Sequence, residues 1–594
     1  MRPLLSEEEY NHTAAVVADF QREGGEGEAL QQFLQEKADS ERNWMEEWWE
    51  QLAYLRTRTT MAIHINWFGV FPEWGFEIDN LSAAALLIEA MLKQRTKIDS
   101  GQFGFEEMRG QPLDMHQFTR VFGMTRVPAE GADLLVQAPD SRHIALMRDG
   151  AILSVDVYDE KGAPLPFARL RAALAAALEL ADAKYCLEDQ SVEAGRAQKD
   201  GTLTGTHVNA SVITAAGRDV WARERAVLQG EPTSKASLEV VESAICCMAF
   251  ERASPANKQE VASLCHGGKC RNLWFDKSVT MLIFENGRVG INAEHTPIDA
   301  MTIVSLIIRA LEEMKGVIGD KAKREALLAA KPSSGSVTPP TMLQWVLPPS
   351  CRVALETASS EVVALASDCE IVHLQFPHFG KGLVKRLKLH PDFFMQMAIQ
   401  LSYFRMHKKF AATYETGHTR AFFHGRTDTV RTLSTQSVAW CHAMEDPTLS
   451  PAEKIAALRT ACDAHSEQVQ RVLTGQGIDR HLLGLYIAAY LQGTEPFPSI
   501  FTDKAYKLSG GGGNYVVSTS NVGYSPLFGG FAPMTADGYG CCYAMLEGRM
   551  NIMVTTWKSC AHTSAATFSD VLAKALVDMR DLGTAAAAAA GSKL

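Results

Sequence analysis

The sequence predicts an α/β protein built in two halves. Three observations lead to this fold class. At 594 residues the chain is too long for one hydrophobic core. Its composition, with 46% hydrophobic and 21% charged residues, is ordinary for a globular enzyme. Apolar segments with strand character also alternate with segments of helical periodicity along most of its length.

The chain divides into four predicted regions. The segment LAAKPSSGSVTPPTM (328–342) has the Pro, Ser and Gly content of a linker and sets the main boundary. The tryptophans of WMEEWWEQLAYL (44–55) are expected to pack onto a larger body. The regions are a helical segment at 1–60, an α/β domain at 61–340, a second α/β domain at 341–583 and a flexible tail at 584–594.

Two hairpins and a long helix are predicted in the first domain. HIALM and AILSVDVY form a hairpin across Arg148-Asp149-Gly150, and RLRAALAAALELADA is typical of a helix. In SVTMLIFENGRVGINAEH, Asn286-Gly287 predicts a two-residue turn between apolar strands. His295 then follows the second strand.

The second domain is predicted to open with the strand EIVHLQF, followed by a basic loop and the helix PDFFMQMAIQLSYFRMHKKFA. A further helix is expected in DRHLLGLYIAAYLQG. The stretch NYVVSTSNVGYSPLFGGFAPMTADGYGCCYAML has the composition of strands and turns.

Charge and cysteine usage exclude several classes of protein. The net charge of -11 argues against a nucleic-acid partner. The twelve cysteines lack metal-ligand spacing, so we expect reduced thiols and no metal. We also expect no cofactor. No run of about 18 apolar residues occurs, so no membrane span is expected. The terminal Ser592-Lys593-Leu594 has the form of a signal read by the peroxisomal import receptor.

Three His-x-x-x-Asp patterns are candidates for a general base: His295/Asp299, His424/Asp428 and His442/Asp446. The context favours the first, because His295 ends a strand and Thr296-Pro297 is typical of a helix start, with Asp299 in the first turn. Histidine has its pKa near neutral pH, as a general base requires. The pattern by itself also fits a capping or surface histidine.

A basic segment, HFGKGLVKRLKLHPD (378–392), stands out in an acidic chain. If it is helical, Lys381 and Lys385 at i,i+4 can converge on one phosphate, and Gly380 and Gly382 would let the backbone approach a ligand. A solvated charged face remains the alternative.

These motifs, in this order, resemble the carnitine/choline acyltransferase family. NAEHTPIDA resembles its catalytic-histidine segment, FGKGLVKRLKLHPDFFMQMAIQLSYFR its coenzyme A segment and TYETGHTRAFFHGRTDTVRTLST its carnitine segment. GQGIDRHLLGL, VVSTS and GFAPMTADGYG complete the set. The resemblance runs from RPLLSEEEY to KALVDMRDL and is strongest to the catalytic region of the carnitine palmitoyltransferase type 1 group. It implies a two-domain architecture like that of chloramphenicol acetyltransferase, with mixed sheets flanked by helices and an active site in a tunnel between the halves.

The resemblance also implies roles for individual residues. His295 is the general base, Asp299 supports it, and Ser520 donates to the oxyanion in a direct transfer without an acyl-enzyme. The implied coenzyme A site comprises Gly380, Lys381, Lys385, Arg386 and Asp392. The implied carnitine site comprises Tyr414, Thr416, Thr427, Arg480, Ser518 and Phe531.

Substrate choice follows from two further positions. Thr427-Asp428-Thr429 matches the carnitine pattern, where the choline branch has Val-Asp-Asn. Gly529 matches a position where acetyl-preferring enzymes carry methionine, so an open acyl tunnel for medium or long chains is implied. Choline or acetyl transfer and a catalytically inactive acyl-CoA-binding scaffold remain alternatives.

The resemblance finally implies a cellular setting. The type 1 group carries a membrane-spanning region ahead of the segment that RPLLSEEEY resembles, and the chain is expected to be a membrane-free catalytic body. With the C-terminal Ser-Lys-Leu, we expect a monomeric enzyme of the peroxisomal matrix that binds acyl-CoA and carnitine.

Overall fold

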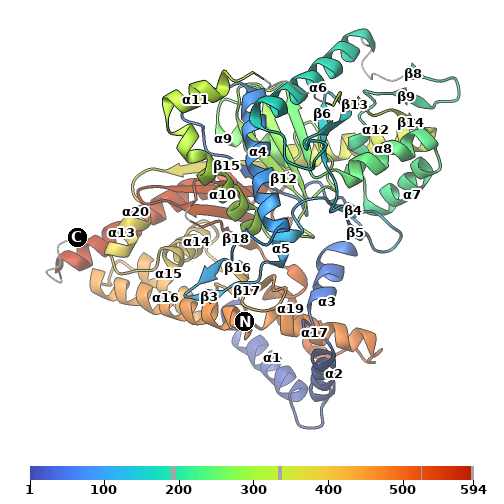
Figure 1. Ribbon diagram of the computed structural model, residues 1–594. Coiled ribbons are helices and arrows are strands. Elements are labelled where there is room, and N and C mark those ends of the chain that lie inside the picture. Colours follow the sequence, from blue (N-terminus) through green and yellow to red (C-terminus); the bar gives the residue numbers. More distant parts are fainter. Residues whose placement is uncertain (189–195, 332–337, 524, 590–594) are drawn as a thin grey trace. The chain divides into compact units, whose positions relative to one another are not determined.

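The computed structural model describes residues 1–188, 196–331, 338–523 and 525–589 (Figure 1). The chain divides into two compact units. Unit 1 consists of Met1–Trp49, Glu106–Asp114 and Cys369–Leu594, and unit 2 of Glu50–Phe105 and Met115–Asp368.

The main division differs from the predicted one. It falls between Asp368 and Cys369. Helix α12 (Pro349–Asp368) packs against α7 (Arg218–Gln229), so the segment after the predicted linker stays with unit 2. Part of that linker, 332–337, lies outside the described residues. The N-terminal helices belong to unit 1, as do the residues 106–114 that form a short hairpin.

Unit 2 is built on a mixed sheet in which the strands run in the order β13-β7-β6-β10-β11-β12-β1. The parallel pairs are β10 with β6 and with β11, and the other pairs are antiparallel. The strands of the unit, including the small sheets β14-β9-β8 and β4-β5, are β1 (Trp67–Val70), β4 (Met124–Val127), β5 (Leu134–Gln137), β6 (His143–Arg148), β7 (Ala151–Asp156), β8 (Arg196–Ala197), β9 (Leu203–Gly205), β10 (Cys247–Glu251), β11 (Val279–Phe284), β12 (Val289–Ala293), β13 (Thr341–Met342) and β14 (Trp345–Leu347).

Helices flank this sheet. The remaining helices of unit 2 are α4 (Asn80–Asp99), α5 (His116–Thr119), α6 (Phe167–Glu188), α8 (Pro232–Ser243), α9 (Lys258–His266), α10 (Ala300–Ile318) and α11 (Lys321–Leu328). Helix α4 packs against α6 and α10, whereas α9 packs against β1 and β12. The helix predicted from its alanine- and leucine-rich sequence is confirmed as α6.

Both predicted hairpins are confirmed, as β6–β7 and β11–β12. The turn of the second hairpin differs from the prediction. The amide of Phe284 donates to the carbonyl of Arg288 (3.0 Å) and that of Gly287 to the carbonyl of Phe284 (2.9 Å), so the loop has three residues. Gly287 has a positive φ of 75° and Asn286 does not, which indicates a type I turn with a glycine bulge.

Unit 1 is built on a six-stranded mixed sheet in the order β15-β21-β20-β18-β16-β17. Strand β18 is parallel to both β16 and β20, and the other pairs are antiparallel. The strands of the unit are β2 (Glu107–Met108), β3 (Gln111–Pro112), β15 (Cys369–Phe376), β16 (Thr413–His418), β17 (Thr427–Arg431), β18 (Val517–Asn521), β19 (Phe528–Gly530), β20 (Tyr539–Met545) and β21 (Met550–Trp557).

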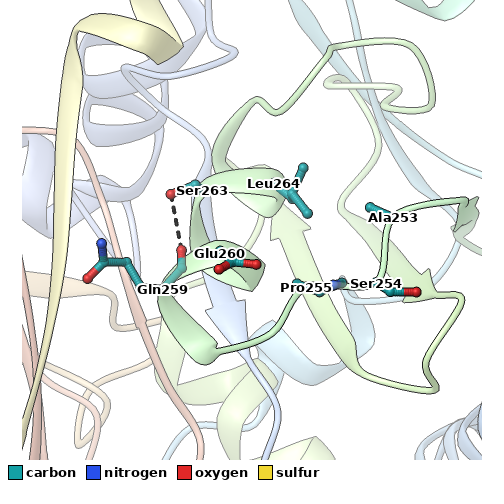
Figure 2. A pocket seen from close by; sticks show the side chains of 7 residues that line it. All are labelled: Ala253, Ser254, Pro255, Gln259, Glu260, Ser263 and Leu264. Atoms are coloured by element: carbon teal, nitrogen blue, oxygen red, sulfur yellow. Dashed lines mark hydrogen bonds between the residues drawn. The ribbon is translucent and has the colours of Figure 1, made fainter.

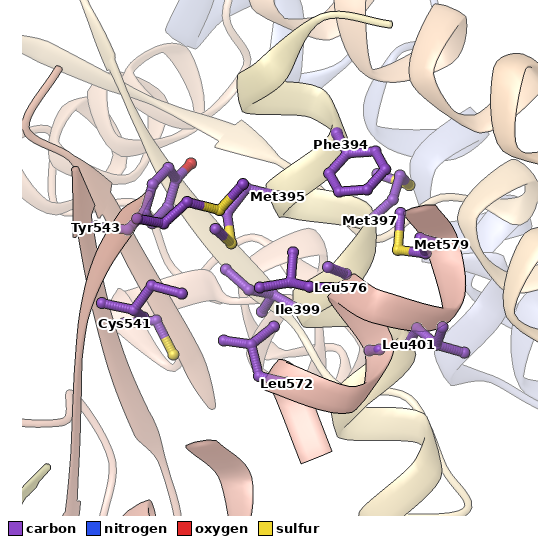
Figure 3. Close-up of a cluster of buried hydrophobic side chains, with 14 of the residues drawn as sticks. Phe394, Met395, Met397, Ile399, Leu401, Cys541, Tyr543, Leu572, Leu576 and Met579 are labelled. Carbon is purple, nitrogen blue, oxygen red and sulfur yellow. The ribbon is translucent and has the colours of Figure 1, made fainter. Parts of the chain in front are cut away.

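The helices of unit 1 bury one face of this sheet. They are α1 (Glu7–Phe20), α2 (Glu26–Ser40), α3 (Glu46–Glu50, which ends in unit 2), α13 (Lys381–Arg386), α14 (Pro391–His407), α15 (Thr435–Glu445), α16 (Pro451–Leu473), α17 (Asp479–Leu491), α18 (Ser499–Thr502), α19 (Lys504–Leu508) and α20 (Ala565–Ala589). Figure 3 shows side chains of α14 and α20 packed with Cys541 and Tyr543 of β20. The predicted strands and helices of this part of the chain are confirmed.

The alanine-rich C-terminus also differs from the prediction. Helix α20 continues to Ala589, so 584–589 is helical, as the high helix propensity of alanine explains. The Ser-Lys-Leu sequence lies outside the described residues. Among the described helices, none has both the length and the apolar character needed to cross a bilayer. The described cysteines form no disulfide, and all except Cys560 are buried.

Candidate functional site

His295 lies just after β12, in the loop that leads into α10. Its Nδ1 is 3.1 Å from the carbonyl oxygen of Ile298, which requires the proton on Nδ1 and places the basic lone pair on Nε2. The ring packs beside that of Tyr54, with centroids 5.5 Å apart, and its side chain is 33% exposed. A fixed tautomer and partial exposure are what a general base needs.

Asp299 is the N-cap residue of α10, one position before the helix, whereas the sequence predicted it in the first turn. Its side chain does not cap the helix. The carboxylate accepts a hydrogen bond from the amide of Gln117 (3.0 Å) and lies 3.9 Å from Nδ1 of His295. Asp299 can therefore stabilise a protonated imidazole without being hydrogen-bonded to Nδ1.

The predicted carnitine residues of β16, β17 and β18 share one face of the unit 1 sheet. Tyr414 is paired with Ser518, and Thr416 follows Tyr414 on the same side of β16. Thr427 is paired with His418, two further residues along that side, and Ser520 follows Ser518. The opposite side carries Val517, Tyr539 and Tyr543, which lie in the core under α14 and α20. This polar face is thus the side of the sheet opposite α14 and α20.

Phe531 lies over the same polar face. Its carbonyl accepts from the hydroxyl of Thr555 (2.7 Å), and a Cβ at Gly540 would lie 3.2 Å from its ring. Because Gly540 is the partner of Ser518 across the sheet, the Phe531 ring lies beside Ser518. Gly529 is in the adjacent strand β19, which packs against β20 and β21.

Arg480 is the second residue of α17, at the edge of this sheet. Its Nε donates to the carbonyl of Thr427 (2.9 Å), and its guanidinium lies 3.5 Å from the centre of the Trp49 ring. Its backbone amide donates to Asp428 (3.3 Å), which fixes the start of the helix. The Nη2 atom is buried and has no hydrogen-bond partner in the described part of the chain. A buried unpaired donor is costly, and a bound carboxylate would satisfy it.

The basic segment forms the short helix α13, which carries Lys381 and Lys385 one turn apart. Lys385, Arg386 and Lys388 are exposed and make no ion pair with any described residue. These charges remain available to an anion.

The two glycines of this segment allow a close approach of the backbone to another part of unit 1. A Cβ at Gly380 would lie 2.1 Å from the carbonyl oxygen of Leu546, and one at Gly382 would lie 2.2 Å from the Glu547 carboxylate. The amides of Lys381 and Gly382 donate to the carbonyls of Leu546 and Glu547. Both glycines therefore allow α13 to approach the turn between β20 and β21, which the sequence did not reveal.

Asp392 is buried in an internal polar cluster of unit 1. Its carboxyl accepts from Asn521 (2.7 Å) and from the Tyr543 hydroxyl (2.6 Å), and it faces the buried Glu415. Burial, reinforced by Glu415, raises the pKa of Asp392 to about 7, and burial raises that of Glu415. The carboxyl of Asp392 therefore links the start of α14 to β18 and β20.

The other histidine candidates make different contacts. His424 lies 2.9 Å from Glu46, and His442 packs its ring against Phe404 and Phe410. A pocket of about 390 Å³ occurs in unit 2 between Ala253–Pro255 and the first turns of α9 (Figure 2). It contains none of the predicted site residues.

Sequence reasoning missed the side chains that hold the His295 loop. Gln117 binds Asp299, and the fully buried Arg126 binds Thr296, the residue after His295. Both come from a segment far from His295 in the sequence, and no local pattern marks either of them.

Comparison with known proteins places these features in context. A family model described as choline/carnitine O-acyltransferase matches residues 1–574. The carnitine O-acetyltransferase of Columba livia is 33% identical over 599 residues, which cover 98% of this chain and 90% of that protein. The peroxisomal carnitine O-octanoyltransferase of Bos taurus is 30% identical over 602 residues, covering 98% of this chain and 93% of that protein.

The raised pKa of Asp392 predicts a pH-dependent stability. Between its unfolded pKa of about 4 and its folded value of about 7, the folded state binds more protons, so stability falls as the pH rises through this window. One proton changes the free energy of unfolding by up to about 1.4 kcal/mol per pH unit. We expect Asp392→Asn to reduce this slope in urea unfolding between pH 5 and pH 8.

The exposed Asp463 of α16 provides the matched control, and Asp463→Asn is expected to leave the slope unchanged. If the free energy of unfolding of Asp392→Asn and of the unmodified protein changed equally with pH, Asp392 would not have the raised pKa.

Proposed function

Because the chain belongs to the choline/carnitine O-acyltransferase family, we propose that it moves a medium- or long-chain acyl group between coenzyme A and L-carnitine, with His295 as the general base. The observation that carries the proposal is the hydrogen bond from Nδ1 of His295 to Ile298, which leaves Nε2 as the basic atom. Acyl transfer to an alcohol needs such a base, because a hydroxyl is a poor nucleophile at neutral pH.

In the proposed reaction, Nε2 of His295 removes the proton from the carnitine hydroxyl while its oxygen attacks the thioester carbonyl. The tetrahedral intermediate carries a negative oxygen, to which the Ser520 hydroxyl donates a hydrogen bond. Collapse breaks the carbon–sulfur bond, and the imidazolium returns its proton to the departing thiolate. Asp299, 3.9 Å from Nδ1, stabilises the imidazolium, and no acyl-enzyme forms.

The polar face of the unit 1 sheet supports carnitine as the acceptor. Carnitine combines a carboxylate with a quaternary ammonium. The buried Nη2 of Arg480, which has no hydrogen-bond partner among the described residues, suits the carboxylate. The hydroxyls of Tyr414, Thr416, Thr427 and Ser518 add further donors on the same face. The ring of Phe531 beside Ser518 suits the ammonium. Choline lacks the carboxylate and would leave Arg480 unsatisfied, so it is the weaker candidate.

Lys381, Lys385 and Arg386 are proposed to bind the phosphates of coenzyme A. They lie on one short helix, and Lys385 and Arg386 make no ion pair with the part of the chain that the structure describes. Each phosphate contact of this kind is charge-assisted and roughly twice as strong as a neutral hydrogen bond.

The names of the relatives support two chain-length classes, acetyl and octanoyl. Gly529 supports the longer class, because it adds no side chain to β19. The octanoyltransferase relatives are peroxisomal, which supports the same location for this protein.

The direct test is thiol release from acetyl-, octanoyl- and palmitoyl-CoA with carnitine, with choline or with neither. We expect carnitine-dependent release that is faster with octanoyl- or palmitoyl-CoA than with acetyl-CoA. His295→Ala is expected to lower kcat by about a hundred- to ten-thousand-fold, the usual effect of losing a general base, whereas His442→Ala is expected to retain activity. Acyl-CoA binding without carnitine-dependent thiol release would identify an inactive scaffold. Choline-dependent thiol release would identify a choline acyltransferase.

Arg480→Gln tests the carnitine site. Loss of a charge-assisted contact of about 1.5–3 kcal/mol is expected to raise the KM for carnitine about ten- to a hundred-fold, with little change in the KM for acyl-CoA. Arg471→Gln, which removes an exposed arginine that pairs with Glu467, is the control and is expected to change neither constant. An equal rise in both KM values for Arg480→Gln would argue against a specific carboxylate contact.

Gly529→Met tests the acyl tunnel. Each buried CH₂ contributes about 0.8 kcal/mol, so blocking the chain is expected to lower kcat/KM for octanoyl-CoA at least about ten-fold while acetyl-CoA changes little. Gly548→Met, in the exposed β20–β21 turn, is the control. An unchanged ratio of kcat/KM for octanoyl-CoA to kcat/KM for acetyl-CoA would show that the acyl chain does not pass Gly529.

A further inference from the structure

We propose that Gln117 and Arg126 are positioning residues that hold the His295 loop from its two ends. The loop comprises residues 294–299, between β12 and α10. Gln117 is 2% exposed and Arg126 is fully buried, and both lie in the α5–β4 segment of unit 2. The inference rests on the proposed function, since positioning has meaning only for a histidine that acts on a substrate.

Gln117 holds the end of the loop at Asp299. Its amide oxygen accepts from the backbone amide of Asp299 (2.7 Å) and from the Thr302 hydroxyl (3.0 Å), both at the start of α10. Its amide nitrogen donates to the Asp299 carboxylate (3.0 Å). One side chain thus replaces the missing cap of the helix and also orients the carboxylate next to His295.

Arg126 holds the end of the loop at Glu294 and Thr296. Its Nη1 donates to the Thr296 hydroxyl (3.2 Å) and lies 3.6 Å from the Glu294 carboxylate. The same carboxylate accepts from the amide of Thr296 (3.0 Å). Nη2 of Arg126 donates to the carbonyl of Tyr54 (2.8 Å), whose ring lies against His295. A single guanidinium therefore fixes both the chain beside His295 and the ring that packs on it.

Arg126 is itself held by a buried network of charges. Asp133 accepts from Arg126 (2.7 Å), Arg218 (2.6 Å) and Arg58 (3.0 Å). Burial alone would raise the pKa of Asp133, but Arg218 and Arg126 outweigh burial and lower it, so the carboxylate stays charged. Arg218 continues the network to Asp276, which also accepts from the Trp221 indole (2.6 Å). Buried charges held by several short hydrogen bonds of this kind favour a single arrangement of the network.

The consequence concerns the rate of the chemical step more than substrate binding. A displacement of about 1 Å at a catalytic group can reduce the rate about a hundred-fold. Gln117 and Arg126 lie beneath the loop and are buried, so their loss is expected to move His295 without removing a substrate contact. Substitution of either residue is therefore expected to lower kcat and to leave the KM values for acyl-CoA and carnitine nearly unchanged.

The test uses the full chain with Gln117→Ala and, as matched control, Gln94→Ala. Gln94 is also buried in unit 2, on α4, and its amide nitrogen has no partner among the described residues. We expect Gln117→Ala to lower kcat about ten- to a hundred-fold with both KM values within about three-fold of the unmodified enzyme. Gln94→Ala is expected to leave all three constants unchanged.

A second measurement does not depend on turnover. Diethyl pyrocarbonate acylates a basic imidazole nitrogen, and the rate at His295 can be followed by mass spectrometry of its peptide. We expect this rate to change at least about three-fold in Gln117→Ala and not in Gln94→Ala. Thr302→Val removes one of the contacts to Gln117 and provides a milder variant if Gln117→Ala unfolds.

Arg126→Lys tests the end of the His295 loop at Glu294 and Thr296. Lysine keeps the positive charge but lacks the planar guanidinium that reaches Thr296 and Tyr54. A lower kcat and a changed labelling rate are expected again. An unmodified chain without acyl transfer would overturn the proposed function, while the labelling rates would still decide whether the loop is held. Labelling rates and kcat values in Gln117→Ala and Arg126→Lys equal to those of the Gln94 control would overturn the present proposal.

Discussion

The alternation of side chains along a β-strand determines where the candidate acceptor site can form in unit 1. Helices α14 and α20 bury one face of the sheet through Val517, Tyr539 and Tyr543. The residues between these positions must then point to the other face. Because β16 and β18 are paired with Tyr414 opposite Ser518, hydroxyl groups from separate motifs meet on that face. A slip of one residue in this register would place them in the core.

A different principle governs the environment of His295. There the loop is held by buried polar groups that come from the α5–β4 segment. A buried arginine such as Arg126 is stable only because Asp133, Thr296 and the Tyr54 carbonyl satisfy it. A loop stabilised in this way has little freedom, which suits a base that must keep one tautomer and one orientation.

The basic helix α13 combines close backbone packing with exposed positive charges. Gly380 and Gly382 permit contact with the β20–β21 turn, while the lysines beside them stay outside the core. The carboxyl of Asp392 lies in an internal cluster with Tyr543 and Asn521. Family membership identifies the chemistry as acyl transfer.

The sequence by itself determined the α/β class, both hairpins, the main helices and the family, because these depend on local periodicity and on contiguous motifs. It also singled out His295 and the polar residues of β16 and β18 as candidates, because their patterns are local. Only the tertiary structure decided the boundary at Asp368, the three-residue turn at Gly287 and the contacts of Gln117 and Arg126 with the His295 loop. These depend on which distant segments pack together, and a buried hydrogen bond between residues 117 and 299 leaves no periodic trace in the chain.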